Sequence, residues 1–206
     1  MLEILTQFLI ASILLTLSPG PDILYVLVTG LSRGVKSGLL LSFGLVSGIL
    51  VHTSLVTFGV SAIIKSSEIL FFGIKLAGAI YLLYLAYKTY NQPAKISIEP
   101  SQTNQKSTNL FKQGFLMNVL NPKVTLFFMA FLPQFLWDKS GNYVFQFYSL
   151  GFIFMVQAFI IFGFVSLFAS RFYKLIQSQT KVAVIFKYIQ IFVLVFLATY
   201  ILFSDI

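Results

Sequence analysis

Two proline-containing segments interrupt otherwise apolar sequence, and each carries residues that could hold a charged solute. The first segment is Ser18-Pro19-Gly20-Pro21-Asp22, and the second is Asn121-Pro122-Lys123. Pro122 follows Pro19 by 103 residues, which is half of the 206-residue chain. Interrupted hydrophobic segments at matching positions in two halves of a chain are typical of the substrate site of a secondary transporter built from repeats. The spacing therefore predicts a small-solute carrier with its site between the two breaks.

The chemistry of the first break follows from Pro19 and Pro21, because proline has no amide hydrogen. These prolines leave the carbonyls of Leu15 and Leu17 without their usual helical partners. Where the helix restarts, its first amides face the gap with the positive end of a helix dipole, which favours a carboxylate. The freed carbonyls and Asp22 could hold an ammonium. We expect this geometry to suit an amino-acid zwitterion better than a sugar or an inorganic cation.

Asp22 is the only acidic residue deep in an apolar stretch. A charged side chain at the centre of a membrane helix costs about 2.5 to 3.5 kcal/mol on insertion scales, so a residue at this depth is a functional candidate. Asp22 could exchange a proton during the transport cycle. The alternative role is structural, as the N-cap of the restarted helix.

The second break adds two side-chain amides and a cation. Pro122 frees the carbonyl of Asn118, and Asn121 and Lys123 flank the proline. Pseudo-symmetry between the halves predicts that Lys123 lies close to Asp22, either as a gate or as a static ion pair between helices. Tyr81, which lies between the two breaks in the sequence, is a further candidate. The candidate substrate-binding residues are Ser18, Pro19, Gly20, Pro21, Asp22, Asn118, Asn121, Pro122, Lys123 and Tyr81.

Two further apolar stretches contain small or polar residues at helical spacing. Gly44, Gly48 and His52 recur every four residues, so they share one face on which another helix can approach closely. His52 is the only histidine and is a second candidate for proton coupling, although a buried hydrogen-bonded role is the plainer reading. Gly78 and Tyr81 could line a cavity or simply pack, and we assign Gly78 to helix packing.

The composition places these residues in a lipid bilayer. Hydrophobic residues make up 58% of the chain and charged residues 10%, and the mean hydropathy is +0.91, which excludes an ordinary soluble domain. We expect most phenylalanines and tyrosines to face lipid or the interface. A span needs about 20 apolar residues. Six stretches meet this requirement: 4–31, 38–64, 69–90, 111–136, 143–169 and 181–203.

The expected fold is an all-α polytopic membrane protein with six transmembrane helices in one membrane domain, residues 1–206. A polar segment at 91–110 joins a first three-helix repeat, 1–90, to a second, 111–206. Most lysines and arginines fall on the same side as this segment, which places it in the cytoplasm and both termini outside. An odd number of spans per repeat makes the two repeats inverted, with the first and fourth helices broken.

Other functional classes fit less well. The net charge of +8 is spread over short loops rather than one face, so we predict no nucleic-acid partner. One histidine and no cysteine exclude a paired-histidine zinc enzyme, and no nucleotide-binding loop occurs, so we expect no enzyme, no metal and no cofactor. A channel, or a carrier for a cation or another small solute, stays open as the alternative. The sequence leaves open whether the carrier is a homodimer.

Several ordered motifs resemble the LysE/RhtB family of amino-acid exporters. Ser18-Pro19-Gly20-Pro21-Asp22 is similar to the signature of the family's first span, and Asn121-Pro122-Lys123 to that of its fourth. The segments from Gly44 to His52 and from Lys75 to Tyr84 resemble the second and third spans. The resemblance covers about residues 1 to 136. It implies a bacterial inner-membrane exporter of amino acids or close derivatives, driven by proton exchange.

Overall fold

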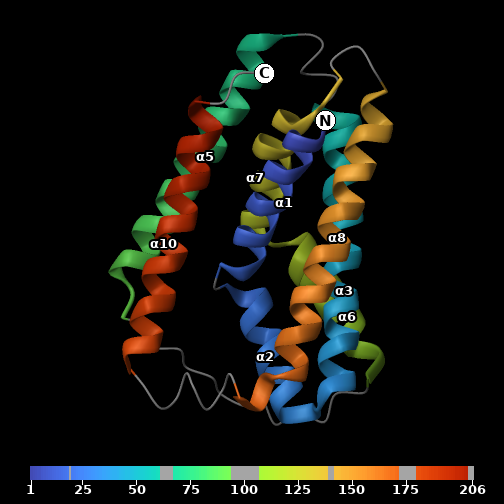
Figure 1. Cartoon of the computed structure of the whole chain (residues 1–206), viewed down its shortest axis with the longest axis vertical. Helices are drawn as coiled ribbons and strands as arrows, with labels where there is room; N and C mark the ends of the chain where they lie inside the picture. The colour runs from blue at the N-terminus through green and yellow to red at the C-terminus, as the bar shows by residue number, and fades with distance from the viewer. Residues whose placement is uncertain (19, 61–66, 94–106, 139–141, 172–179, 204–206) are drawn as a thin grey trace.

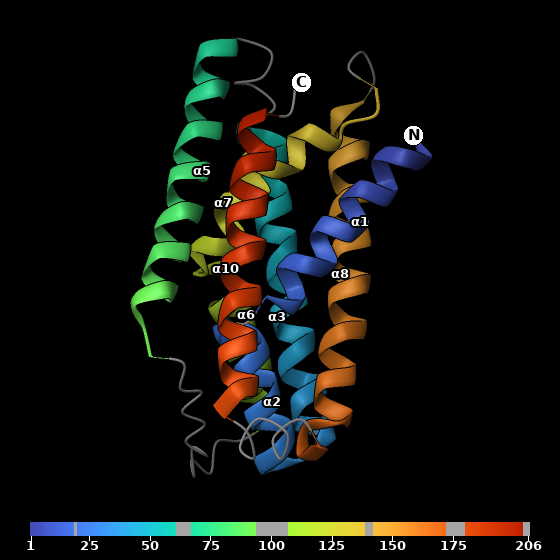
Figure 2. The same cartoon turned by 60° about the vertical axis from the view of Figure 1, so that its left-hand side comes forward.

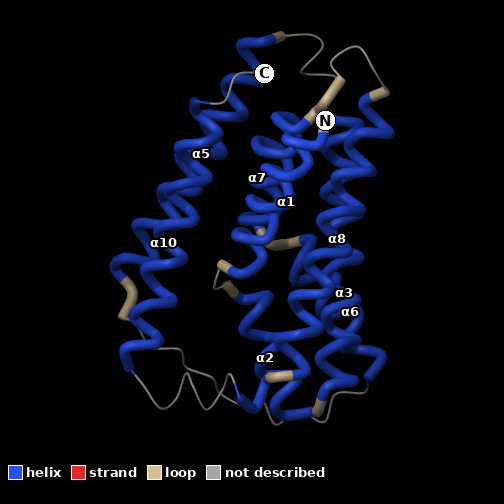
Figure 3. Tube along the Cα trace, in the orientation of Figure 1, coloured by secondary structure: helices blue, strands red, loops and turns tan. Residues whose placement is uncertain are grey.

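The protein is helical throughout the part of the chain that the computed structural model describes, residues 1–18, 20–60, 67–93, 107–138, 142–171 and 180–203 (Figure 3). The helices that follow one another along the chain are α1 (Leu2–Leu17), α2 (Pro21–Arg33), α3 (Val35–Leu55), the π-helical turn η1 (Val56–Val60), α5 (Glu68–Asn91), α6 (Ser107–Val119), α7 (Pro122–Phe131), the 3-10 turn η2 (Leu132–Phe135), α8 (Tyr143–Leu167) and α10 (Thr180–Phe203).

Within the described residues, four helical segments are long and apolar enough to cross a membrane by themselves: Val35–Gly59, Ile69–Asn91, Tyr143–Leu167 and Val184–Phe203. Two bent pairs bring the total to as many as six candidate spans by length and composition. The axes of α1 and α2 differ by 60°, and those of the α6 and α7 segments by 51°. The all-helical prediction is therefore confirmed, and both bends fall where the prolines predict them.

The two restarts follow from ordinary helix-capping chemistry. Pro21 and Pro122 each occupy the first position of a helix, where their missing amide costs nothing and their fixed φ suits the helix. Asn121 is the N-cap of α7, and its side chain accepts a hydrogen bond from the backbone amide of Lys123 at 3.1 Å. Gly20 is the N-cap of α2, with extended backbone. The alternative role for Asp22 as an N-cap is therefore wrong, because Asp22 is the second residue of α2.

The helices form a main bundle with a pair of helices at its side. Figures 1 and 2 show α5 and α10 running antiparallel beside each other, and in Figure 1 α7 and α1 lie between this pair and the rest. On the other side α3 packs against α6 and α8. The start of α1 and the end of α10 lie at one end of the molecule, whereas the end of α2 and the start of α3 lie at the other.

Close helix contacts depend on glycines. A Cβ atom added to Gly44 of α3 would collide with the backbone of Phe111 of α6, and one added to Gly48 would lie 2.7 Å from Oδ1 of Asn118. A Cβ at Gly78 of α5 would lie 2.6 Å from the Cβ of Ala130 on α7. All three glycines assigned to packing thus face a neighbouring helix with no room for a side chain.

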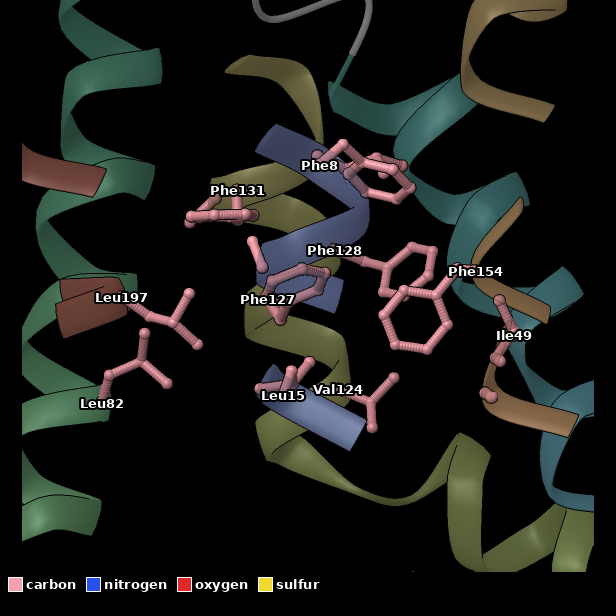
Figure 4. Close-up of a cluster of buried hydrophobic side chains, with 14 of the residues drawn as sticks. Phe8, Leu15, Ile49, Leu82, Val124, Phe127, Phe128, Phe131, Phe154 and Leu197 are labelled. Carbon is pink, nitrogen blue, oxygen red and sulfur yellow. The ribbon is translucent and has the colours of Figure 1, made fainter. Parts of the chain in front are cut away.

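An aromatic cluster fills the middle of the bundle. Phe127 and Phe128 of α7 are fully buried, and Phe154 of α8 contacts both, with ring centroids 5.7 and 5.2 Å away (Figure 4). Phe8 of α1 is also fully buried, and its ring meets Phe135 edge-on at 5.3 Å. These rings are exceptions to the expectation that most phenylalanines face lipid or the interface, and they provide the core against which the broken helices pack.

Two predicted boundaries differ from the structure. The second stretch, expected over 38–64, becomes the π-helical turn η1 before it ends, and 61–66 lies outside the described residues. Of the expected linker, 91–110, the first residue ends α5 and the last four belong to α6, while 94–106 lies outside the described residues.

Candidate functional site

The two helix breaks lie against each other near the middle of the bundle (Figure 3). The ammonium of Lys123, from the start of α7, donates to the backbone carbonyls of Leu15 and Ser18, at 3.2 Å in each case. The side-chain amide of Asn121 donates to Oδ2 of Asp22 at 3.0 Å. Residues about a hundred positions apart in the sequence therefore meet, as the spacing of the prolines predicts.

Each break exposes different chemistry. At the first break the Leu15 carbonyl, which the sequence predicts to be free, accepts from a side chain of the other half. Pro19 itself lies outside the described residues. At the second break the sequence predicts a free carbonyl on Asn118, but this carbonyl is occupied. It accepts hydrogen bonds from the backbone N–H of Asn121 at 2.9 Å and from Nε2 of His52 at 3.0 Å. The first break thus offers acceptors, whereas the second supplies donors.

A small pocket of about 30 Å³ lies between the breaks. Its polar side includes Ser18, Gly20, Pro21, Asp22, Asn118, Asn121 and Lys123. Its apolar side includes Leu15, Ile23, Ile49, Val124, Phe154, Ala158 and Phe162. A water molecule needs at least about 10 to 15 Å³ measured in this way, and pockets for small-molecule ligands are typically about 300 Å³ or larger. The pocket in this conformation has room for a water molecule but not for an amino acid.

Several polar atoms at the pocket have no hydrogen-bond partner among the described residues. They include Oγ of Ser18, Oδ1 of Asp22 and Oδ1 of Asn118. Buried polar atoms are nearly always satisfied, by protein or by water, so this group of orphaned atoms indicates a place for water or a ligand. All of them can accept a hydrogen bond, and the carboxylate and the amide oxygen can only accept. The pocket therefore has more acceptors than donors.

Not every predicted residue reaches the pocket. Pro122 starts α7 beside it without being one of its lining residues, and Tyr81 is half-buried on α5, with its ring 6.0 Å from that of Tyr84. Tyr81 is also not among the lining residues, because α5 packs with α10 and α7 on the side of the bundle. His52 is buried and ties α3 to the backbone of Asn118. In this conformation His52 acts as a fixed hydrogen-bonding residue behind the pocket.

Helix α8 also contributes to the pocket, which the sequence did not predict. Phe154, Ala158 and Phe162 occur every four residues, so they share one face of α8 and line the apolar side of the pocket. One turn of this helix also carries Gln157, whose amide nitrogen donates to Oγ1 of Thr16 at 3.0 Å. Gln157 is a polar residue in the middle of a membrane-length apolar stretch, and that position was the signal that could have pointed to this helix.

Comparisons with known proteins point to a transporter. The chain matches the family model described as LysE type translocator over residues 13–204. It is 29% identical over 177 residues to a leucine efflux protein of Klebsiella pneumoniae, covering 85% of this chain and 84% of that relative. A leucine efflux protein of Enterobacter sp. is 31% identical over 186 residues, or 84% of each chain. The Bacillus subtilis uncharacterized membrane protein YrhP is 33% identical over 138 residues, covering 63% of this chain and 65% of that relative. No solved structure matches.

The family match includes both breaks, the pocket between them and all the candidate spans except residues 2–12, the first three turns of α1. The named relatives are efflux and membrane proteins. The chain therefore belongs to the LysE type translocator family, and it is a multi-pass membrane transporter rather than an enzyme.

Proposed function

We propose that this protein exports a neutral aliphatic amino acid, leucine or a close analogue, from the cytoplasm. The observation that carries the proposal is the two-sided pocket between the breaks. Its polar side gathers one carboxyl group, one amine and several backbone acceptors, and its apolar side is lined by aliphatic and aromatic carbon. A zwitterion with an aliphatic side chain has the same division of polarity. The names of two relatives, both leucine efflux proteins, support this choice of substrate.

The transport mechanism that we propose is alternating access. Three spans precede the long connection after α5 and three follow it, so α1/α2, α3 and α5 form one repeat and α6/α7, α8 and α10 form the other. With three spans each, the repeats are inverted. The repeats rock against each other around the pocket, and the closed pocket of this conformation is an intermediate between its two open forms. A channel would instead need a continuous water path.

Orientation and energy coupling complete the proposal. The end of the molecule where α2, α5 and α8 finish carries Arg33, Lys88 and Arg171, so the positive-inside rule assigns it to the cytoplasm and both termini to the outside of a bacterial plasma membrane. Protons are the counter-ion, taken up and released by Asp22, which is the acidic residue of the pocket. His52 is the second candidate for this role. The homodimer stays an open alternative.

The test is efflux from proteoliposomes that contain the purified protein and a mixture of amino acids. We expect leucine and similar residues to leave in a saturable way, with polar and charged amino acids retained. An external pH below the internal pH is expected to accelerate efflux, because protons then move inward in exchange. Efflux that rises linearly with concentration and accepts inorganic cations would instead establish the channel alternative and contradict the proposal.

A further inference from the structure

The amine of Lys123 lies where a substrate amine would be expected to bind. The carbonyls of Leu15 and Ser18 are the acceptors of the first break, and Nζ of Lys123 donates to both at 3.2 Å. We propose that these two carbonyls, with Asp22 beside them, form a subsite for a primary ammonium, and that Lys123 occupies this subsite until the substrate displaces it. The inference rests on the proposed function, since it assigns the amine end of the same substrate.

The remaining groups around Lys123 favour a cation with hydrogens to donate. Ser18 and Asp22, which line the pocket with Lys123, each have an oxygen, Oγ and Oδ1, that can accept a hydrogen bond and has no partner among the described residues. A primary ammonium has three hydrogens to donate and no acceptor, so it complements such a set, whereas a carboxylate does not. If the Lys123 side chain left, the pocket would keep the Asp22 carboxyl group and at least two free carbonyls. The subsite thus selects an amine.

Displacement is required because there is no room for both amines. The space left in the pocket, about 30 Å³, is of the size of a water molecule and not of an amino acid. Lys123 is attached through a flexible four-carbon stem at the second position of α7, so its ammonium can turn away without moving the helix. Turned away, it remains near enough to meet the carboxylate of the arriving zwitterion. One amine then replaces another, and the charge of the site stays balanced.

This exchange gives the empty carrier a defined state. Without Lys123, an unloaded pocket would hold the Asp22 carboxyl group without a cation, at a depth where an unpaired charge is costly. With Lys123 in place, the pocket without substrate keeps a cation beside the Asp22 carboxyl group, so the empty carrier is not left with an unpaired charge at this depth. The cost is affinity, since a substrate must compete with a tethered amine whose effective concentration is in the millimolar range or above.

A binding experiment separates this role from the alternative that Lys123 simply binds the substrate carboxylate. The probe is 3-methylbutylamine, which has the leucine carbon chain and a primary ammonium but no carboxylate. We measure its dissociation constant, and that of leucine, by calorimetry on the purified wild-type protein, on Lys123→Met, and on a control, Lys112→Met. Met has about the length of Lys without the charge, and Lys112 lies on α6 away from this pocket.

The displacement role predicts that Lys123→Met binds the amine about tenfold more tightly than the wild type, because an occupant that fills the subsite nine-tenths of the time lowers apparent affinity by about tenfold. Lys112→Met is expected to bind it as the wild type does. An amine affinity that is unchanged or weaker in Lys123→Met overturns the inference. If that variant does not fold, Lys123→Gln is measured in its place.

A second measurement needs no substitution. The primary amine is expected to inhibit leucine efflux by the wild-type protein, whereas its N-trimethyl derivative, which has no hydrogen to donate, is expected to inhibit at least tenfold less well. Equal inhibition by the two probes would show that no hydrogen-bonding subsite recognises the amine. Failure of the proposed function gives a different result from failure of the subsite. In that case wild-type proteoliposomes export no amino acid at all.

Discussion

Ala158 is predicted to set the size of side chain that the carrier accepts. It is buried on α8, 1% exposed, between Phe154 and Phe162 on the face that lines the pocket. A small residue between two rings leaves more room for a ligand than a larger residue would. The substitution Ala158→Val adds two methyl groups to this face. The free space in the pocket is only about 30 Å³, so each added methyl group takes up room that a larger substrate side chain needs.

The magnitude follows from the loss of room for the substrate. One methylene in a hydrophobic pocket changes discrimination by about 1 to 3 kcal/mol, or about 10- to 200-fold. We expect Ala158→Val to lower leucine export relative to alanine export by at least tenfold. The assay is efflux from proteoliposomes loaded with equal concentrations of leucine, valine and alanine, with the three rates measured together, so that differences in protein amount cancel.

The control for this experiment is Ala198→Val on α10. Ala198 is as deeply buried as Ala158, at 0% exposed, but does not line the pocket. Overpacking there costs about 1 to 3 kcal/mol of stability, so all three rates could fall while their ratio stays constant. A leucine-to-alanine ratio in Ala158→Val within twofold of the wild-type ratio would refute the assignment of the α8 face to the substrate side chain.

Three other substitutions test the remaining parts of the site. Asp22→Asn keeps a side-chain oxygen that can accept the hydrogen bond from Asn121, but it removes the ionisable group. We therefore expect leucine efflux to lose its response to a pH gradient while the protein stays folded. A wild-type response would show that Asp22 does not couple efflux to protons. Pro122→Ala restores the amide that the break lacks, and we expect at least tenfold slower export, whereas an unchanged rate would mean that the bend only serves packing. Gly44→Leu forces a side chain against the backbone of Phe111 and is expected to destabilise the fold by at least about 1 to 3 kcal/mol, seen as a lower melting temperature in detergent; an unchanged melting temperature would contradict the close α3–α6 contact.

The sequence is most informative where local chemistry decides the structure. Span lengths follow from apolar runs, and each restart follows from a proline at the first position of a helix. The meeting of Asp22, Asn121 and Lys123 could also be predicted, because two breaks at half-chain spacing occupy equivalent depths. Each of these features depends only on local sequence or on the spacing of residues along the chain.

The rest of the pocket depends on helix rotation, which an apolar span does not encode. In a soluble helix the buried face is apolar and the exposed face polar, but in a membrane both faces are apolar. Phe154 and Phe162 line the pocket, whereas Phe152 and Phe164 of the same helix are exposed, and nothing in their type distinguishes them. The same ambiguity explains why Tyr81 was expected in the pocket. It follows a glycine-containing motif, but its helix, α5, packs at the side of the bundle.

The two breaks are complementary in chemistry, so the proposed repeat, although weak in sequence, can still build one site. If both breaks presented free carbonyls, the pocket would repel the substrate carboxylate, and if both presented lysine it would repel the ammonium. In this chain the first break supplies carbonyls and a carboxyl group, and the second supplies Asn121 and Lys123 as donors. On the proposed function, a zwitterion needs different chemistry at the two breaks, so identical sequences there would bind it poorly. The backbone break is the property that both halves need, and proline is the residue that each half retains for it.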